Sequence, residues 1–174
     1  MTRAQAGLFR KAFGSVIEGL NAIGTVWIFG LLLLINADIG ARGLLKAPIP
    51  GVPEIVELSI VGIVFLQAAH TLRVGRLTRA DVLFNAIAKR WPKVARGFGL
   101  AFNLTGAALF AIIFVVSVPY FSESWTKDLF VGAEGGFTAP TWPVKLITLI
   151  GCAAMIAQFL ALAWSEARAI LGRE

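Results

Sequence analysis

The chain has very few of the side chains that build metal centres, haem sites and disulfide scaffolds. Its 174 residues include one cysteine, Cys152, and one histidine, His70. A single cysteine excludes a disulfide within the chain, and a single histidine excludes a haem held by two histidines or a histidine-rich metal site. No serine elbow or catalytic cysteine accompanies His70. We therefore expect no enzymatic activity and no cofactor.

Charge is also scarce. Only 15% of the residues are charged and 57% are hydrophobic, which is more apolar surface than a soluble domain of this length can bury in one core. The composition predicts an integral membrane protein. The net charge of +6 does not indicate nucleic acid binding here, because the distribution of the charge matters more than its total.

Long uncharged stretches alternate with charged segments along the chain. Each stretch is close to the roughly 20 residues that a helix needs to cross a bilayer, once the second is counted from Pro53, a residue suited to a first helical turn. We predict one all-α membrane domain over residues 1–174. Its four transmembrane helices are predicted at 19–37, 54–73, 97–122 and 144–165.

Lysine and arginine are distributed unevenly between the loops. Twelve lie in the N-terminal segment, the middle loop and the C-terminal tail, and four lie in the other two loops. Because cytoplasmic loops are enriched in these residues, both termini are predicted to be cytoplasmic. Trp91 and Trp164 then fall at the inner boundary and Trp125 and Trp142 at the outer one, where indoles are favoured. Trp27 lies in mid-span, where we expect it to pack against another helix.

A membrane helix and a basic segment share the stretch 54–83. Ionisable groups at the ends of a span are functional candidates, because they are costly in lipid. We expect them to fix the helix ends by pairing within the chain, with a partner subunit or with lipid headgroups. Ion or proton binding stays open for one of them, Glu57, as does a proton relay or an interfacial hydrogen bond for His70. The candidate residues are Glu57, Arg73, Arg76, Arg79 and Asp81.

The middle loop also carries a predicted amphipathic helix, over about residues 79–93. Leu83, Ile87 and Trp91 recur every four residues, opposite a face with Lys89 and Lys93. A basic amphipathic helix of this kind suits anionic phospholipid at the cytoplasmic surface. Trp91 is therefore a further candidate contact to lipid or to a partner.

The two outer loops differ in composition. Residues 38–47 mix leucines with charged residues before a proline-rich break, which fits either a short interfacial helix along the membrane surface or an ordinary loop. The loop between the third and fourth spans contains Gly135, Gly136 and Pro140, which indicate a compact connection, and Pro143 suits the first turn of the last helix.

The centres of the spans contain few polar side chains that could bind a solute. The two halves of the chain also show no convincing similarity, whereas carriers that act alone have internal repeats and broken helices with polar groups at mid-membrane. Small residues instead recur four apart, as at Gly99, Asn103 and Ala107, and such stripes allow helices to approach closely. The chain has the pattern of a packing partner and not of a pore.

Several segments carry a family resemblance. They are Glu57, Gly62, the run RVGRLTRADVL at 73–83 and the run TAPTWP at 138–143. Over nearly its whole length the chain resembles the small permease subunit of tripartite ATP-independent periplasmic (TRAP) transporters. Leu77 stands where a histidine is common in that family, while Gly75, Arg79 and Asp81 keep the framework.

The resemblance implies a multi-pass protein of the bacterial inner membrane. A periplasmic binding protein would deliver an organic acid anion to a large membrane subunit, which would hold the substrate and ion sites of a symporter driven by sodium or protons. The small subunit would be the fixed scaffold of an elevator mechanism, without substrate, metal or cofactor ligands of its own. The alternatives are a membrane anchor or assembly subunit of an unrelated inner-membrane complex, and an independent small channel.

Overall fold

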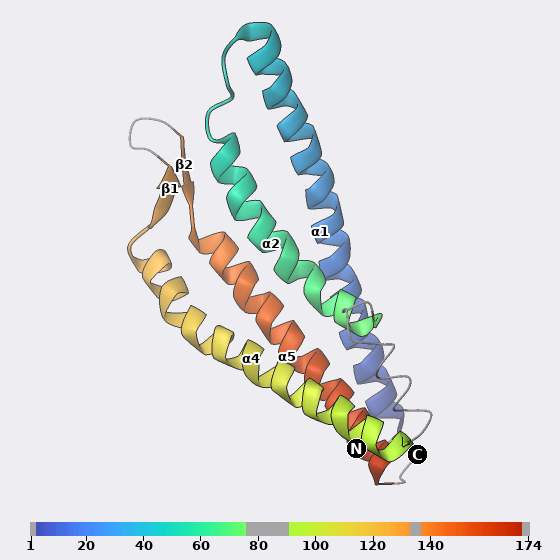
Figure 1. The fold of residues 1–174 in the computed structure, drawn as a ribbon. Helices are drawn as coiled ribbons and strands as arrows, with labels where there is room; N and C mark the ends of the chain where they lie inside the picture. Colours follow the sequence, from blue (N-terminus) through green and yellow to red (C-terminus); the bar gives the residue numbers. More distant parts are fainter. Residues whose placement is uncertain (1–2, 76–90, 133–136, 172–174) are drawn as a thin grey trace.

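The computed structural model of the protein describes residues 3–75, 91–132 and 137–171. Within these residues, four helices are each long and apolar enough to cross a membrane, as the sequence predicted. Two short strands join the third of these helices to the fourth (Figure 1). The elements in chain order are α1 (Arg3–Leu45), α2 (Val52–Arg73), α4 (Pro92–Thr126), β1 (Phe130–Gly132), β2 (Thr138–Pro140) and α5 (Trp142–Ile170).

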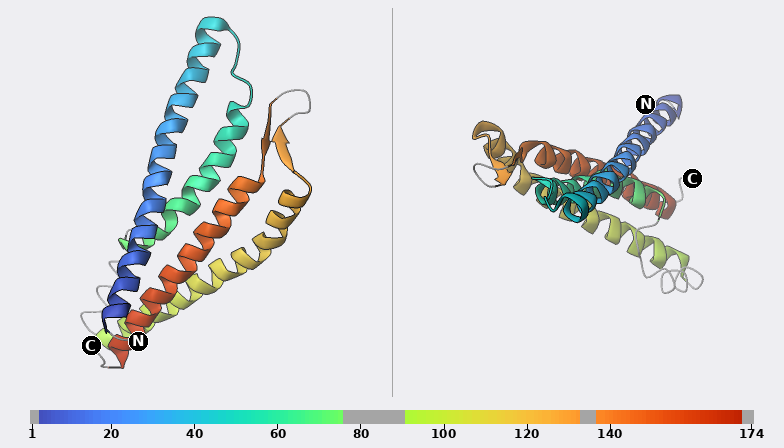
Figure 2. Two further views of the ribbon diagram at one scale, coloured as in Figure 1. Left: turned by 180° about the vertical axis from the view of Figure 1, so that it is seen from behind. Right: turned by 90° about the horizontal axis from the view of Figure 1, so that it is seen from above.

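The helices lie side by side in the order α1, α2, α5, α4, and each packs mainly on its neighbours in that series. Figures 1 and 2 show this arrangement from the front, from behind and from above. The start of α1 and the end of α5 lie at the same end of the layer (Figure 1). Seen from above, the starts of α1 and α4 lie apart at this end, on either side of the end of α5 (Figure 2). The fold is therefore an open layer of helices and not a closed four-helix bundle.

The open layer exposes a large apolar surface. The accessible area is 11835 Å² for a mass of 18.6 kDa, whereas a compact soluble protein of this mass would expose roughly 8,200 Å². Many of the exposed side chains are large and apolar, including Val26 and Leu33 of α1, each 71% exposed. Lipid or another protein must cover these faces, because exposing so much apolar surface to water is energetically unfavourable.

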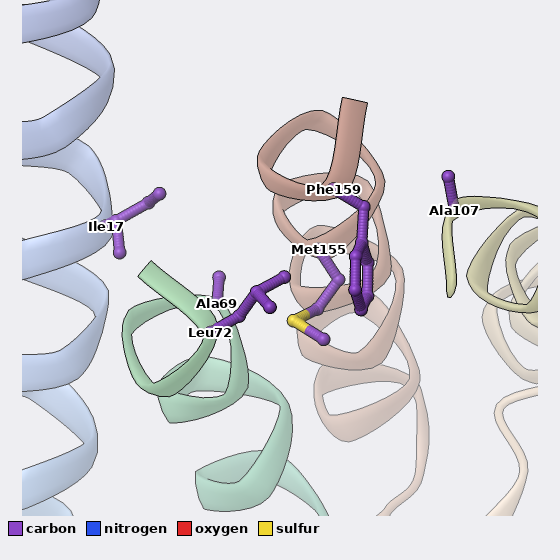
Figure 3. Close-up of a cluster of buried hydrophobic side chains, with 6 residues drawn as sticks. All are labelled: Ile17, Ala69, Leu72, Ala107, Met155 and Phe159. Atoms are coloured by element: carbon purple, nitrogen blue, oxygen red, sulfur yellow. The ribbon is translucent and has the colours of Figure 1, made fainter. Parts of the chain in front are cut away.

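The small buried core draws on all four helices. Met155 and Phe159 of α5 lie at its centre, between α2 and α4 (Figure 3). The ring of Phe159 lies over Gly106 of α4, where an added Cβ would meet ring carbons at 2.6 Å. The other buried members of the cluster are Ile17, Ala69, Leu72 and Ala107.

Helix α1 is longer than the sequence analysis predicted. Its 43 residues span about 65 Å, and residues 38–45 continue the helix instead of forming the separate surface helix or the loop that we expected. The side chain of Asp38 explains the continuation and its end. Its Oδ2 accepts a hydrogen bond from Nε of Arg42, one turn on, at 2.7 Å, and its Oδ1 accepts one from the backbone N–H of Ile49 at 2.8 Å. Asp38 thus holds both the last turns of α1 and the loop beyond them.

The connection between α4 and α5 is an antiparallel pair of strands that we did not predict. Val131 of β1 pairs with Ala139 of β2. Phe137, just before β2, lies against Gly51, the residue before α2. Gly51 has a φ of 85°, and an added Cβ would overlap the Phe137 ring, so glycine is required there for both reasons. The contact ties together the two loops at this end of the layer.

The close contact of α5 with α2 predicts that adding a single methyl group at Gly151 lowers the stability of the fold. A Cβ at Gly151 would lie 2.5 Å from the backbone oxygen of Phe65. Backbone cannot move aside as a side chain can, so Gly151→Ala should lower the free energy of unfolding by about 1–3 kcal/mol. Titration with SDS in mixed micelles would measure this.

Gly30→Ala is the matched control, because an added Cβ at Gly30 has nothing within 4 Å. It should leave stability unchanged or raise it by up to about 1 kcal/mol, since alanine is the better helix former. Equal effects of the two substitutions would contradict the packing of α5 on α2 described above.

Candidate functional site

The structure describes three of the six candidate contact residues named from the sequence: Glu57, Arg73 and Trp91. Arg76, Arg79 and Asp81 lie outside the described residues, as does most of the amphipathic helix predicted over 79–93. Trp91 is the residue that precedes α4 and is 59% exposed. Each of the other two, Glu57 and Arg73, is found in a different environment.

Arg73 joins the end of α2 to the first half of α1. Its Nη1 donates a hydrogen bond to the backbone oxygen of Gly14 at 2.7 Å and another to Oε1 of Glu18 at 3.2 Å. The guanidinium can come this close because residue 14 is glycine, where an added Cβ would lie 2.5 Å from Nη2. Arg73 therefore pairs within the chain, which is one of the three kinds of pairing considered from the sequence.

Glu57 lies on an exposed face of α2. Within the described part of the chain, it has no hydrogen-bond or ion-pair partner. Ile60, Val61 and Val64 recur at helical spacing on the same side and are 42–57% exposed. Glu57 thus stands at the α1–α2 loop end of an apolar stripe that this chain leaves uncovered.

Two polar atoms of α2 are buried without a hydrogen-bond partner among the described residues. They are Oε2 of Glu54, in the first turn, and Nδ1 of His70, in the last turn. The two lie at opposite ends of a helix of 22 residues, so they do not form one site. Their separation gives no support to a proton path along α2.

Polar side chains on the facing sides of the two helices connect α1 to α2. Nε1 of Trp27 donates to Oγ of Ser59 at 3.0 Å, which confirms that Trp27 packs against another helix. Nearer the Arg73 end, Nε2 of Gln67 donates to Oγ1 of Thr25 at 3.3 Å, beside Gly24, where an added Cβ would meet the Gln67 side chain at 2.9 Å. These contacts fix the register of the two helices.

A second polar cluster closes the end of the layer that holds the strands. Nζ of Lys145 donates to the backbone oxygen of Tyr120 at 3.2 Å and also to Oγ of Ser124. Oγ1 of Thr141 donates to the backbone oxygen of Leu129 at 3.0 Å, and the Thr141 N–H donates to the same oxygen at 3.0 Å. The run TAPTWP is thus structural: it forms β2 and the start of α5.

The opposite end of the layer has basic contacts that the sequence analysis did not assign. Nη1 of Arg96, in the second turn of α4, donates to the backbone oxygen of Ala169 near the end of α5 at 2.8 Å. The guanidinium of Arg168 lies over the ring of Trp164, 5.1 Å from its centroid. Both arginines flank predicted spans, which is the sequence signal they carry. The target of Arg96 is a backbone atom 73 residues away, whereas that of Arg168 is a ring one turn back on the same helix.

Gly75 is one of the residues that carry the family resemblance, and its backbone conformation explains why glycine is found there. It follows α2 with a φ of 69°, a conformation that residues with a Cβ rarely adopt, and its N–H donates to the backbone oxygen of Leu72 at 3.2 Å. The glycine therefore lies just past the end of α2, where a left-handed residue commonly closes a helix. This positions the end of the helix at which Arg73 is bonded to α1.

Taken together, the described polar contacts connect the chain's own helices. The buried polar side chains Ser59, Ser124 and Thr141 are hydrogen-bonded within the layer. Among the described residues, no three of His, Cys, Asp and Glu lie together in a way that could hold a metal ion. The arrangement can hold helices in register, and its exposed apolar faces can receive lipid or other membrane helices.

Comparison with known proteins agrees with this description. The model of one protein family, tripartite ATP-independent periplasmic transporters, DctQ component, matches residues 31–169. The match runs from within α1 nearly to the end of α5 and so includes most of the layer. A comparison with curated proteins and a comparison with solved structures each give no match.

The environment of Arg73 predicts that removing Arg73 costs more stability than removing Glu18. Arg73→Gln should lower the free energy of unfolding in mixed micelles by about 1–3 kcal/mol, because it removes the charged donor to the Gly14 carbonyl. Glu18→Gln should cost less than about 1 kcal/mol, because exposed ion pairs contribute little and the Glu18 side chain is 62% exposed. Because Arg73→Gln removes both contacts, an equal loss for the two substitutions would show that the ion pair, and not the bond to the carbonyl, holds these helices.

Proposed function

The chain belongs to the DctQ component family of tripartite ATP-independent periplasmic transporters, and we propose that it is the fixed small membrane subunit of such a transporter. In this role it is the scaffold beside which the transport domain of a large membrane subunit moves. The family is one of transporter components and not of enzymes. Its members work as parts of a complex, so the proposal includes partners as well as a role for the chain.

One observation supports the scaffold role most directly. The layer is bonded internally at both ends, by Arg73 and Arg96 at one and by Lys145 and Thr141 at the other, while its broad faces stay apolar and open. Polar groups of a translocation path would face an aqueous cavity. Here Ser59 and Gln158 are 2% and 6% exposed and lie between helices. A layer of this kind is suited to hold a neighbour in place.

We assign the remaining functions of the transporter to its other components. A periplasmic binding protein would capture an organic acid anion, and the large membrane subunit would bind that anion together with the coupling sodium ions or protons. The complex would lie in the bacterial inner membrane. Support comes from the family and from the apolar span centres of this chain.

We also propose that both termini are cytoplasmic. Twelve of the sixteen Lys and Arg residues lie in the segments that this orientation places inside. The start of α1 and the end of α5 lie at one end of the layer, as an even number of spans requires. Lys145, Lys127 and the strands would then face the periplasm.

Labelling of single cysteines tests the orientation. In a Cys152→Ala background, Lys127→Cys should react with a membrane-impermeant maleimide in intact spheroplasts, because Lys127 would be periplasmic and its side chain is 64% exposed. Lys11→Cys should react only after the membrane is permeabilised. The reverse pattern would invert the proposed orientation.

Purification and reconstitution test the function. The tagged chain, extracted gently from its native membrane, should bring with it a larger multi-span protein, and a periplasmic binding protein should bind to the pair. The anion that co-purifies with the binding protein, identified by mass spectrometry, then serves as the substrate.

In proteoliposomes, uptake of that anion should require both membrane proteins and an ion gradient, and the small chain alone should transport nothing. Recovery of a redox enzyme in place of the larger subunit, or conduction by the small chain alone, would refute the proposal.

A further inference from the structure

The end of α5 carries a shallow pocket that none of the contacts between helices uses. Its volume is about 310 Å³, and it is lined by Trp164, Ala167, Arg168 and Leu171. Trp164 and Leu171 are 62% and 68% exposed. The pocket thus combines an exposed indole, an aliphatic side chain and a cation at one end of a membrane-spanning helix.

Arg168 is not needed to stabilise the end of its own helix. The last carbonyls of α5 are negative by the helix dipole and would attract a nearby cation. Here the backbone oxygen of Ala167 already accepts a hydrogen bond from the N–H of Leu171 at 3.1 Å, and that of Ala169 accepts one from Arg96 at 2.8 Å. Within the described residues, Arg168 makes neither a hydrogen bond nor an ion pair. Its one described contact is the stacking on Trp164.

The cation–π contact leaves the N–H donors of Arg168 available. The guanidinium carbon lies 5.1 Å from the centroid of the Trp164 ring, and an attraction between a cation and the face of a ring uses no N–H hydrogen bond. This geometry is suited to phosphate, which can accept two parallel N–H bonds from one guanidinium. The nearest acid in sequence, Glu166, lies on another side of α5, against Gly99 of α4, and does not neutralise Arg168.

The pocket lies at the end of a continuous apolar face. Exposed residues recur along α5 at helical spacing on the side of Trp164, and Arg168 is the one charged residue among them. The face has the length of a membrane span, so its apolar part faces acyl chains and Arg168 reaches headgroup depth. The residues of this face are Leu146, Ile150, Ala153, Leu160, Trp164, Arg168 and Leu171.

We propose that this pocket is a binding site for a phospholipid with an anionic headgroup, such as phosphatidylglycerol. The phosphate bonds to the N–H edge of Arg168, and an acyl chain lies along Trp164 and Leu160. The site is distinct from the amphipathic segment considered above and does not depend on the transport role. It requires only that α5 spans a membrane.

Native mass spectrometry of the purified full-length protein tests the site. The protein is released from detergent micelles that contain phosphatidylglycerol or phosphatidylcholine, and the bound lipid is counted. We expect phosphatidylglycerol to be retained in preference, and Arg168→Gln to reduce its retention about fivefold, the effect of roughly one basic residue at an anionic surface. Trp164→Leu should also reduce it, and Arg168→Lys should keep only part of the binding, because lysine retains the charge but cannot form two parallel bonds to the phosphate.

Lys127→Gln is the matched control. Lys127 is an exposed cation near the opposite end of the layer and is paired with Glu123 at 2.8 Å, so its loss should leave lipid retention unchanged. Thermal unfolding of each variant shows whether it is folded, and Trp164→Leu keeps the test decisive if Arg168→Gln unfolds, because it removes another side chain of the same pocket.

Three results would overturn the proposal. Equal retention of phosphatidylglycerol by the parent protein and by folded Arg168→Gln would show that Arg168 binds no headgroup. Inorganic phosphate that binds at Arg168 and displaces the lipid at comparable concentration would make this a site for free anions. Unchanged lipid retention with a loss of co-purifying large subunit in Arg168→Gln would assign the face to a protein partner.

Discussion

Helices in a bilayer gain little by burying apolar side chains against each other, because lipid tails are as apolar as leucine. The layer must therefore be held by close backbone approach and by bonds that lipid cannot replace. Close approach is found where α5 meets its neighbours. Gly151 brings α5 against the backbone of Phe65 in α2, and Gly106 of α4 accepts the ring of Phe159. Without these glycines α5 could not sit between two helices at once.

The second requirement is met at the helix ends. Arg73, Arg96 and Lys145 each donate to a backbone carbonyl of another helix. A bond from a charged donor to a carbonyl is stronger than one between neutral groups, and near the headgroups its charge keeps some contact with water. Interior bonds such as Trp27 to Ser59 fix the relative position of the helices but stabilise them little. Neutral hydrogen bonds between membrane helices contribute only about 0.6 kcal/mol on average. Charged donors thus hold the helices together at their ends, and neutral hydrogen bonds align them near their middle.

The sequence predicted the parts of this structure that depend on local composition. Uncharged stretches located the four helices, because the cost of charge in lipid applies wherever a span lies. They do not give the helix ends, since a helix can continue beyond the uncharged stretch where side chains such as Asp38 and Arg42 support it. The strands were missed because three residues per strand leave too little alternation to detect. The bond from Arg73 to Gly14 joins residues 59 apart, so only the packing of α2 on α1 could reveal it.

An open layer has a consequence for a subunit that holds another in place. In this open layer, exposed apolar side chains lie on all four helices, so a partner can contact more than one helix. A wide face spreads a contact over several helices, and a contact spread in this way resists rocking better than one along a single helix. The same openness exposes α5, the most connected helix, along the face that ends at Arg168. A lipid bound there would cover part of the face that the chain cannot cover itself, and would anchor the centre of the layer to one side of the membrane.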